Sequence, residues 1–266
     1  MKKPLLIFIC ASLLTVFIIL IVKKQNNTEG MPITPKELRV LELSYLRAAI
    51  SQENILDYAH LEVPSLENIN IKSENGTSYL ALRTYPGQPL KNNGIRAEIS
   101  IDYPHKEGDV VRYSWQFRIP ENFQSDTPQN RWWIMGQWHD QPDITKGETW
   151  DTYNPTSPPI GFGYGIIDGK DMLSFIYGRD QKPIRLIPLT RDVWHTIIVD
   201  IIWSQNENGK AKVFFDDAIN PILEATGQNM LNSYQHYFKI GSYRHKDISV
   251  DSTINLRDII IKTVNQ

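Results

Sequence analysis

Hydrophobic and polar residues alternate along several short segments of this chain, and no other feature restricts its fold as strongly. In residues 111–119, Val, Tyr, Trp, Phe and Ile occupy every second position, and polar residues occupy the positions between them. A period of two residues is that of a β-strand with one buried face. The same pattern predicts further strands at 78–83, 95–101, 131–139, 162–167, 173–177, 194–203, 212–215, 237–245 and 254–262.

Turn-forming dipeptides separate the predicted strands at Asn75-Gly76, Asp168-Gly169 and Asn208-Gly209. Such pairs favour tight hairpins between antiparallel strands. Many short strands with no helices between them indicate an antiparallel sandwich or barrel. Hairpins like the one at residues 208–216 are common in lectin-like jelly rolls. This hairpin favours a jelly-roll sandwich as the form of the all-β domain.

The N-terminal residues 4–22 are mostly apolar, with Lys2 and Lys3 before them and Lys23 and Lys24 after them. A helix of this length would span about 28 Å, close to the thickness of a bilayer core. No small-residue cleavage pattern follows, so we expect a signal anchor that binds the membrane, with a cleaved signal peptide as the alternative. Either interpretation predicts an exported protein, periplasmic or extracellular.

Three parts of the chain are expected. Residues 1–24 direct it to the membrane, residues 25–60 form a polar tether and a short helix, and residues 61–266 form the β-jelly-roll domain. Helical spacing of apolar residues places the helix within residues 32–50. The single cysteine, Cys10, lies in the membrane-directed segment, which excludes a disulfide framework and a cysteine-rich zinc site.

Charge restricts the class of partner. The formal net charge of the whole chain is −2. Residues 1–24 contain four of the 28 basic residues and no acidic ones, so the exported part carries −6. This balance argues against a nucleic-acid-binding protein. A polyanionic ligand would have to be bound by a few basic residues at defined positions and not by an overall positive charge. We expect the protein to be a monomer.

Three predicted strands carry an unusual set of residues on the face that points away from the core. In residues 95–101, this face presents Arg96 and Glu98. In residues 131–139, Trp132, Ile134 and Trp138 are expected to point inward, and the outward face is then Arg131, Trp133, Met135, Gln137 and His139. In residues 237–245, Phe238 and Ile240 are expected inward, and the outward face is Tyr237, Lys239, Gly241, Tyr243 and His245.

Each of these residues taken alone could be an ordinary surface ion pair or a packing residue. If the three strands are neighbours, however, one groove gains cations, an amide and two groups that can carry protons. Three such strands in one chain favour a binding or catalytic site over three unrelated surface features.

At these residues the sequence resembles the β-jelly-roll polysaccharide lyases. Their alginate lyases carry an Arg-Ser/Thr-Glu-Leu strand, a Gln-Ile/Val-His strand and a Tyr-Phe-Lys-Ala-Gly-x-Tyr-x-Gln strand. This chain has Arg96-Ala97-Glu98-Ile99, Gln137-Trp138-His139 and Tyr237-Phe238-Lys239-Ile240-Gly241-Ser242-Tyr243-Arg244-His245, in the same order. The departures at Ala97, Trp138 and Arg244-His245 make it more similar to the glucuronan lyase and heparin lyase I groups. The resemblance covers residues 65–264 and implies an all-β, concanavalin-like jelly-roll sandwich with an open groove.

The resemblance implies cleavage of a uronic-acid-containing polysaccharide (glucuronan, alginate or glycosaminoglycan-like) by β-elimination to 4,5-unsaturated products. It implies that Gln137 and Arg96 neutralise the substrate carboxylate. His139 would be the general base. Tyr243 would be the acid to O4, although Tyr243 could also serve as the base, and the sequence leaves this assignment open.

The remaining groove residues would bind the anionic polysaccharide. Lys239 suits the carboxylate or sulfate of an adjacent sugar, and Glu98 could orient Arg96 instead of touching substrate. The other predicted substrate-binding residues are Arg131, Trp133, Tyr237 and Arg244. A non-catalytic, lectin-like module on the same fold is the alternative, but it would not need Gln137, His139 and Tyr243 together.

The acidic loop 140–153 contains Asp140, Asp143, Glu148 and Asp151. Such oxygens could bind Ca²⁺, but their spacing does not match the EF-hand pattern. We therefore expect a solvated loop at the rim of the groove, and no metal or cofactor is required by the sequence.

Overall fold

The computed structural model describes residues 34–154, 156–179, 182–216 and 218–264. The chain divides into two compact units, residues 1–44 and residues 45–266. The predicted membrane-directed segment lies outside the described residues. Within the described ranges, none of the helices has the length and apolar character needed to cross a membrane.

Helix α2 (Pro35–Leu46) lies where the sequence predicts a helix. Its first turn is fixed by a reciprocal pair of hydrogen bonds. The backbone N–H of Glu37 donates to Thr34 Oγ1 at 3.2 Å, and the backbone N–H of Thr34 donates to Glu37 Oε2 at 2.9 Å. This capping box, followed by proline at the first helical position, explains why the helix begins there.

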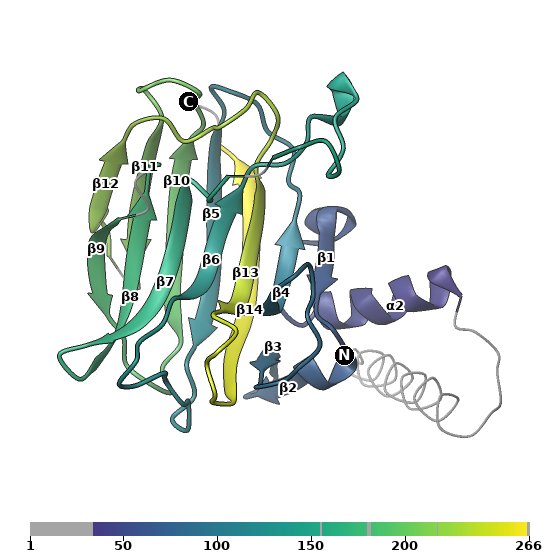
Figure 1. Ribbon diagram of the computed structural model, residues 1–266, viewed down its shortest axis with the longest axis vertical. Helices are drawn as coiled ribbons and strands as arrows, with labels where there is room; N and C mark the ends of the chain where they lie inside the picture. The colour runs from purple at the N-terminus through teal and green to yellow at the C-terminus, as the bar shows by residue number, and fades with distance from the viewer. Residues whose placement is uncertain (1–33, 155, 180–181, 217, 265–266) are drawn as a thin grey trace, which may run out of the picture. The chain divides into compact units, whose positions relative to one another are not determined.

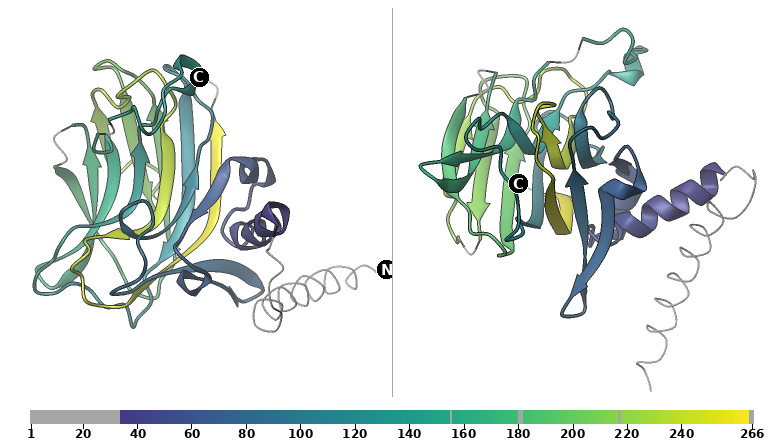
Figure 2. Two further views of the ribbon diagram at one scale, coloured as in Figure 1. Left: turned by 45° about the vertical axis from the view of Figure 1, so that its right-hand side comes forward. Right: turned by 60° about the horizontal axis from the view of Figure 1, so that its bottom comes forward.

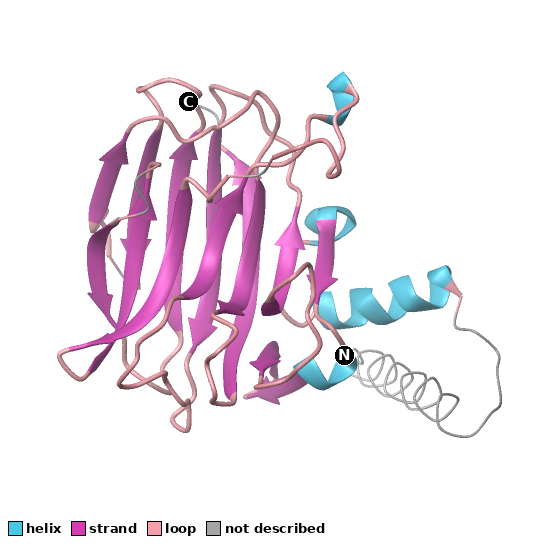
Figure 3. Cartoon of the chain, in the orientation of Figure 1, coloured by secondary structure: helices cyan, strands magenta, loops and turns pink. Residues whose placement is uncertain are grey.

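The second unit consists mainly of strands in two seven-stranded antiparallel sheets, which form a jelly-roll sandwich (Figures 1 and 3). The first sheet has the order β1 (Ala59–Glu62), β4 (Ile95–Ile101), β13 (Tyr237–Arg244), β6 (Trp133–His139), β7 (Ile160–Ile167), β8 (Lys170–Tyr177) and β9 (Pro183–Pro188). The second has the order β12 (Leu223–Thr226), β11 (Lys210–Phe215), β10 (His195–Ile202), β5 (Val110–Arg118), β14 (Ser252–Thr263), β3 (Thr77–Thr84) and β2 (Ile69–Glu74). Three short 3₁₀ helices complete the described structure: η1 (Glu53–Tyr58), η2 (Leu66–Asn68) and η3 (Ile144–Lys146).

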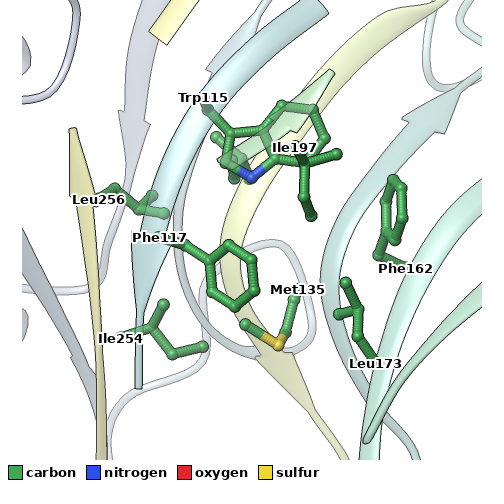
Figure 4. A pocket seen from close by; sticks show the side chains of 9 residues that line it. Trp115, Phe117, Met135, Phe162, Leu173, Ile197, Ile254 and Leu256 are labelled. Carbon is green, nitrogen blue, oxygen red and sulfur yellow. The ribbon is translucent and has the colours of Figure 1, made fainter. Parts of the chain in front are cut away.

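The core lies between the two sheets, whose layers can be followed in Figure 2. Trp138 of β6 stacks on Phe238 of β13 with ring centroids 4.7 Å apart, and Trp115 of β5 approaches Phe238 from the other sheet at 5.2 Å. Figure 4 shows a second part of this interior, where the enclosed space is about 10 Å³. That is about the smallest volume that holds one water molecule, so the sandwich is closely packed.

The inward and outward faces predicted for residues 131–139 are wrong before Gly136. Trp133 and Met135 are buried at 2% and 6% exposure, whereas Trp132 is 46% exposed. The cause is a β-bulge. Ile134 and Gly136 are two residues apart on β6, but they pair with two consecutive residues of β7. One extra residue interrupts the alternation, so the two faces exchange at that point.

Two buried histidines at one end of the sandwich predict sensitivity to acid. His105 stacks on Trp203 at 4.5 Å and accepts the backbone N–H of His236 at Nε2, and His236 accepts the N–H of Leu231 at its own Nε2. Burial lowers the pKa of each imidazole to about 4. Both rings must therefore stay neutral in the folded protein.

An unfolded histidine binds a proton below about pH 6.5. The folded state resists this until about pH 4, so stability should be full above pH 6.5 and fall between pH 6.5 and 4, by about 3 kcal/mol for each ring. Urea unfolding followed between pH 8 and 4 measures this loss. In His236→Gln, the free energy of unfolding should fall less between pH 6.5 and 4. An equally large fall in that variant would contradict the role given to His236.

Candidate active site

A groove of about 1100 Å³ lies over β1, β4, β13 and β6 of the first sheet. The strands β4, β13 and β6 are direct neighbours (Figure 1), so the three strands with unusual residues on their outward faces lie together. All four residues predicted to be catalytic line this groove: Arg96, Gln137, His139 and Tyr243. Two of the predicted binding residues, Tyr237 and Lys239, line it as well.

Strand register sets the order of these side chains along the groove. On β13, Tyr243 pairs with Arg96 of β4, and Tyr237 pairs with His139 of β6. Lys239 lies between them and pairs with Gln137. Gly241 has φ +143°, and a Cβ there would lie 2.4 Å from the carbonyl oxygen of Ala97. The glycine of the third motif is therefore required for the close approach of β13 to β4.

Glu98 lies under the floor of the groove with no exposed surface. One of its oxygens accepts a hydrogen bond from Arg96 Nη1 at 3.2 Å, and the other accepts one from Gln137 Nε2 at 3.1 Å. Burial raises the pKa of Glu98, although the charges of Arg96 and Lys239 oppose this. Glu98 thus positions two donors from different strands and does not line the groove itself, as the sequence allowed.

The ring of Tyr243 lies against the guanidinium of Arg96, with the Arg96 Cζ atom 4.1 Å from the ring centroid. Trp132 also meets the Tyr243 ring edge-to-face, with ring centroids 4.9 Å apart. Trp132 was expected to point inward, but the bulge in β6 directs it to the groove. The phenol ring therefore contacts both an indole and a guanidinium that is suited to bind a carboxylate.

Gly94 leaves the space that this arrangement needs. A Cβ at this position would lie 2.6 Å from Cε2 of Tyr243 and 3.0 Å from Nη2 of Arg96. Gly94→Ala should displace both side chains and lower kcat/KM about 10- to 100-fold with little change in melting temperature. Gly87→Ala is a useful contrast: its φ of +75° means that alanine there strains the backbone, but no atom lies within 4 Å of the added Cβ, so only stability should fall. Unchanged kinetics of Gly94→Ala would show that this stacking is dispensable.

His139 is oriented by Asp140. Its Nδ1 lies 2.8 Å from the carbonyl oxygen of Asp140 and 2.8 Å from the Asp140 Oδ1 atom. Burial alone would raise the pKa of Asp140, but hydrogen bonds from His139 and Tyr153 outweigh it and hold that pKa below its usual range. Both neighbours of Nδ1 are acceptors, so this nitrogen carries the proton. In the neutral imidazole, Nε2 is then the nitrogen with the free lone pair, and it is available to the groove.

The expectation of a solvated acidic loop is wrong for two of its carboxylates. Asp140 and Asp143 are only 1% and 4% exposed. Asp140 also accepts hydrogen bonds from Tyr153 and Thr156, and Asp143 pairs with Lys146 at 2.8 Å. Within the described residues, no group of three or more histidine, cysteine or acidic side chains is placed to bind a metal ion.

Besides Glu98, three predicted binding residues do not line the groove. Trp133 is buried, and its Nε1 donates to Ser242 Oγ at 2.9 Å. Arg244 is also buried, with its guanidinium 5.2 Å from the Trp133 ring, because even-numbered residues of β13 point into the sandwich. Arg131 precedes β6 and pairs with Asp126 at 2.8 Å.

Among the other groove residues that sequence reasoning missed are Glu62 and Trp150. Glu62 ends the four-residue strand β1 and contacts both Arg96 and Lys239. Trp150 is 55% exposed in the loop between β6 and β7, and it meets the ring of Tyr237 at 6.2 Å. A lone tryptophan in a polar loop was the available signal for Trp150. Nothing in the alternation pattern indicated Glu62.

Residues 51–260 match the family model described as polysaccharide lyase. The chain belongs to the polysaccharide lyase family. It is thus an enzyme, a carbon–oxygen lyase. Among solved structures, an endo-β-1,4-glucuronan lyase from the fungus Trichoderma reesei is similar, with 18% identity and a TM-score of 0.53 over 74% of this chain and 87% of that one.

A double mutant of the alginate lyase Aly36B in complex with alginate trisaccharide is also similar, with 16% identity and a TM-score of 0.51 over 78% of this chain and 88% of that one. At these identities the two structures show a shared fold, and that alginate lyase binds an anionic oligosaccharide. None of the curated protein sequences that were compared matches this lyase.

Proposed function

We propose that this lyase cleaves a uronic-acid-containing polysaccharide, such as glucuronan, alginate or a glycosaminoglycan-like chain, by β-elimination. A base removes the proton at C5 of the uronate, and the C5–H electron pair forms the C4–C5 double bond. The bond from C4 to O4 breaks, and O4 leaves with a proton. The product carries a 4,5-unsaturated uronate at its new end, and no water is added.

The C5 proton is weakly acidic because the adjacent carboxylate is already charged. Charge that develops during its removal has to be stabilised by donors that are in place beforehand. Arg96 and Gln137 supply such donors in the groove, and both are hydrogen-bonded to Glu98. This convergence of a guanidinium and an amide on one buried carboxylate is the observation that carries the proposal.

His139 and Tyr243 supply the proton transfers. His139 is the proposed base, since Asp140 accepts from its Nδ1–H and so places the lone pair of the neutral ring on Nε2. Tyr243 is the proposed acid to O4, because its ring lies against Arg96 and so beside the bound carboxylate. A carboxylate on C5 and the oxygen on C4 belong to adjacent ring atoms, so the acid has to lie near the carboxylate-binding residue.

The test is an incubation of the purified protein with glucuronan, alginate, heparin and hyaluronan. Ultraviolet absorbance of the double bond conjugated to the carboxylate reports β-elimination directly. We expect a rise with at least one of these polymers. No rise with any of them, at several pH values and with calcium added, would refute the proposal.

A further inference from the structure

Glu62 is a charged residue of the groove to which the proposed chemistry gives no role. Its Oε2 atom accepts a hydrogen bond from Lys239 Nζ at 2.8 Å, one from Arg96 Nη1 at 3.2 Å and one from Asn92 Nδ2 at 3.1 Å. Its side chain is 13% exposed, and those of Arg96 and Lys239 are 7% and 6% exposed. A single carboxylate oxygen therefore occupies both of the cations expected to bind the polyanion.

Glu62 is ionised in this position. Burial alone would raise the pKa of Glu62, but the ammonium of Lys239 and the guanidinium of Arg96 outweigh it and keep that pKa below its usual range. Its place is fixed by the sheet, because Glu62 pairs in register with Glu98 on β4. In the groove without substrate, the carboxylate of Glu62 thus neutralises charge on Arg96 and Lys239.

The other carboxylate that lines the groove is Asp102, and its partners are amides. Asp102 Oδ1 accepts from Gln141 Nε2 at 2.6 Å and from Gln235 Nε2 at 2.7 Å. Among the described lining residues, the permanent charges are therefore Arg96 and Lys239 against Glu62 and Asp102, which cancel. Such a groove lacks the excess of cations that a densely charged polymer requires.

We propose that Glu62 is a specificity-determining residue, which admits polyuronates carrying one carboxylate per sugar and excludes chains that also carry sulfate. A uronate can share the donors of Arg96 and Lys239 with Glu62. An added sulfate next to these residues would face the carboxylate of Glu62 with no cation left to pair with it. Exclusion by a like charge is a common route to specificity. This inference rests on the proposed β-elimination and names the substrate class for it.

The test compares a substrate of the proposed class with the same polymer after chemical O-sulfation, so that the sugar backbone is unchanged. The variants are Glu62→Gln, which removes the charge, and Glu62→Asp, which keeps it. Glu121→Gln is the control, because it makes the same change of net charge at an exposed residue outside the groove. The readout is the ratio of kcat/KM on the unsulfated polymer to kcat/KM on its sulfated form.

We expect the wild-type protein and Glu121→Gln to prefer the unsulfated polymer by at least about tenfold. Glu62→Gln should reduce this ratio by about tenfold, and Glu62→Asp should retain most of it. An equal loss of rate on both polymers in Glu62→Gln would show that Glu62 only positions its neighbours, and would overturn the inference. Equal cleavage of both polymers by the wild-type protein would overturn it while leaving β-elimination intact. Inactivity on every uronate polymer would instead refute the proposed function.

Discussion

Replacing His139 by alanine is expected to lower kcat about a thousandfold, because a positioned general base contributes a factor of that order. Asp140 holds the Nδ1–H of this ring, so the native imidazole presents Nε2 to the groove without a further change of tautomer. Alanine removes the base but leaves Gln137, Arg96 and Lys239 in place. The loss should therefore be in kcat and not in KM, measured as initial rates of double-bond formation.

His60→Ala serves as the control for this prediction, since His60 is exposed and does not line the groove. It should keep the wild-type rate. His139→Ala also takes a hydrogen-bond donor from the buried Asp140 carboxylate and should lower the melting temperature, so the rates are compared at a temperature where both variants are folded. A His139→Ala protein that retained more than about a tenth of the wild-type kcat would show that another group removes the C5 proton.

Tyr243→Phe is expected to lower kcat about a hundredfold or more, because O4 would then leave without a proton donor. The substitution removes one oxygen and leaves the ring, so its contacts with Arg96 and Trp132 should persist. Steady-state kinetics on the best polymer and a thermal unfolding curve measure the two effects separately.

Tyr237→Phe is the matched comparison, because it removes the same atom from another groove tyrosine on the same strand. Tyr237 pairs with His139 and its ring lies 5.8 Å from the imidazole. We expect this variant to lose less than about tenfold in kcat, as for a binding contact. If Tyr237→Phe were the inactive variant and Tyr243→Phe the active one, the two tyrosines would have exchanged roles.

The sequence predicts the central strands of the fold and misses those at its margins. Every strand from β3 to β8, together with β10, β11, β13 and β14, overlaps a predicted segment. The four strands without a prediction, β1, β2, β9 and β12, are the four edges of the two sheets. Edge strands are short and mixed in polarity because only one side is paired and burial is partial, so they carry little alternation.

For the site, the sequence identifies the residues better than their surroundings. The three motifs lie on neighbouring strands, and the residues proposed as catalytic share one groove. No local sequence pattern predicts the bulge in β6. Because of it, Trp132 lines the groove and Trp133 is buried in the core. Contacts between distant segments, such as Glu62 with Lys239, depend on strand order and could not be derived from spacing along the chain.

The most direct test of the account is the identity of the chain end that the protein creates. Digestion of a uronate polymer should give oligosaccharides with a 4,5-unsaturated uronate at the new end, which mass spectrometry detects as a product lighter by one water than the hydrolysis product. The His139→Ala and Tyr243→Phe proteins should yield almost none. Saturated ends from the wild-type protein, or unsaturated ends at undiminished rates from both variants, would contradict β-elimination in this groove.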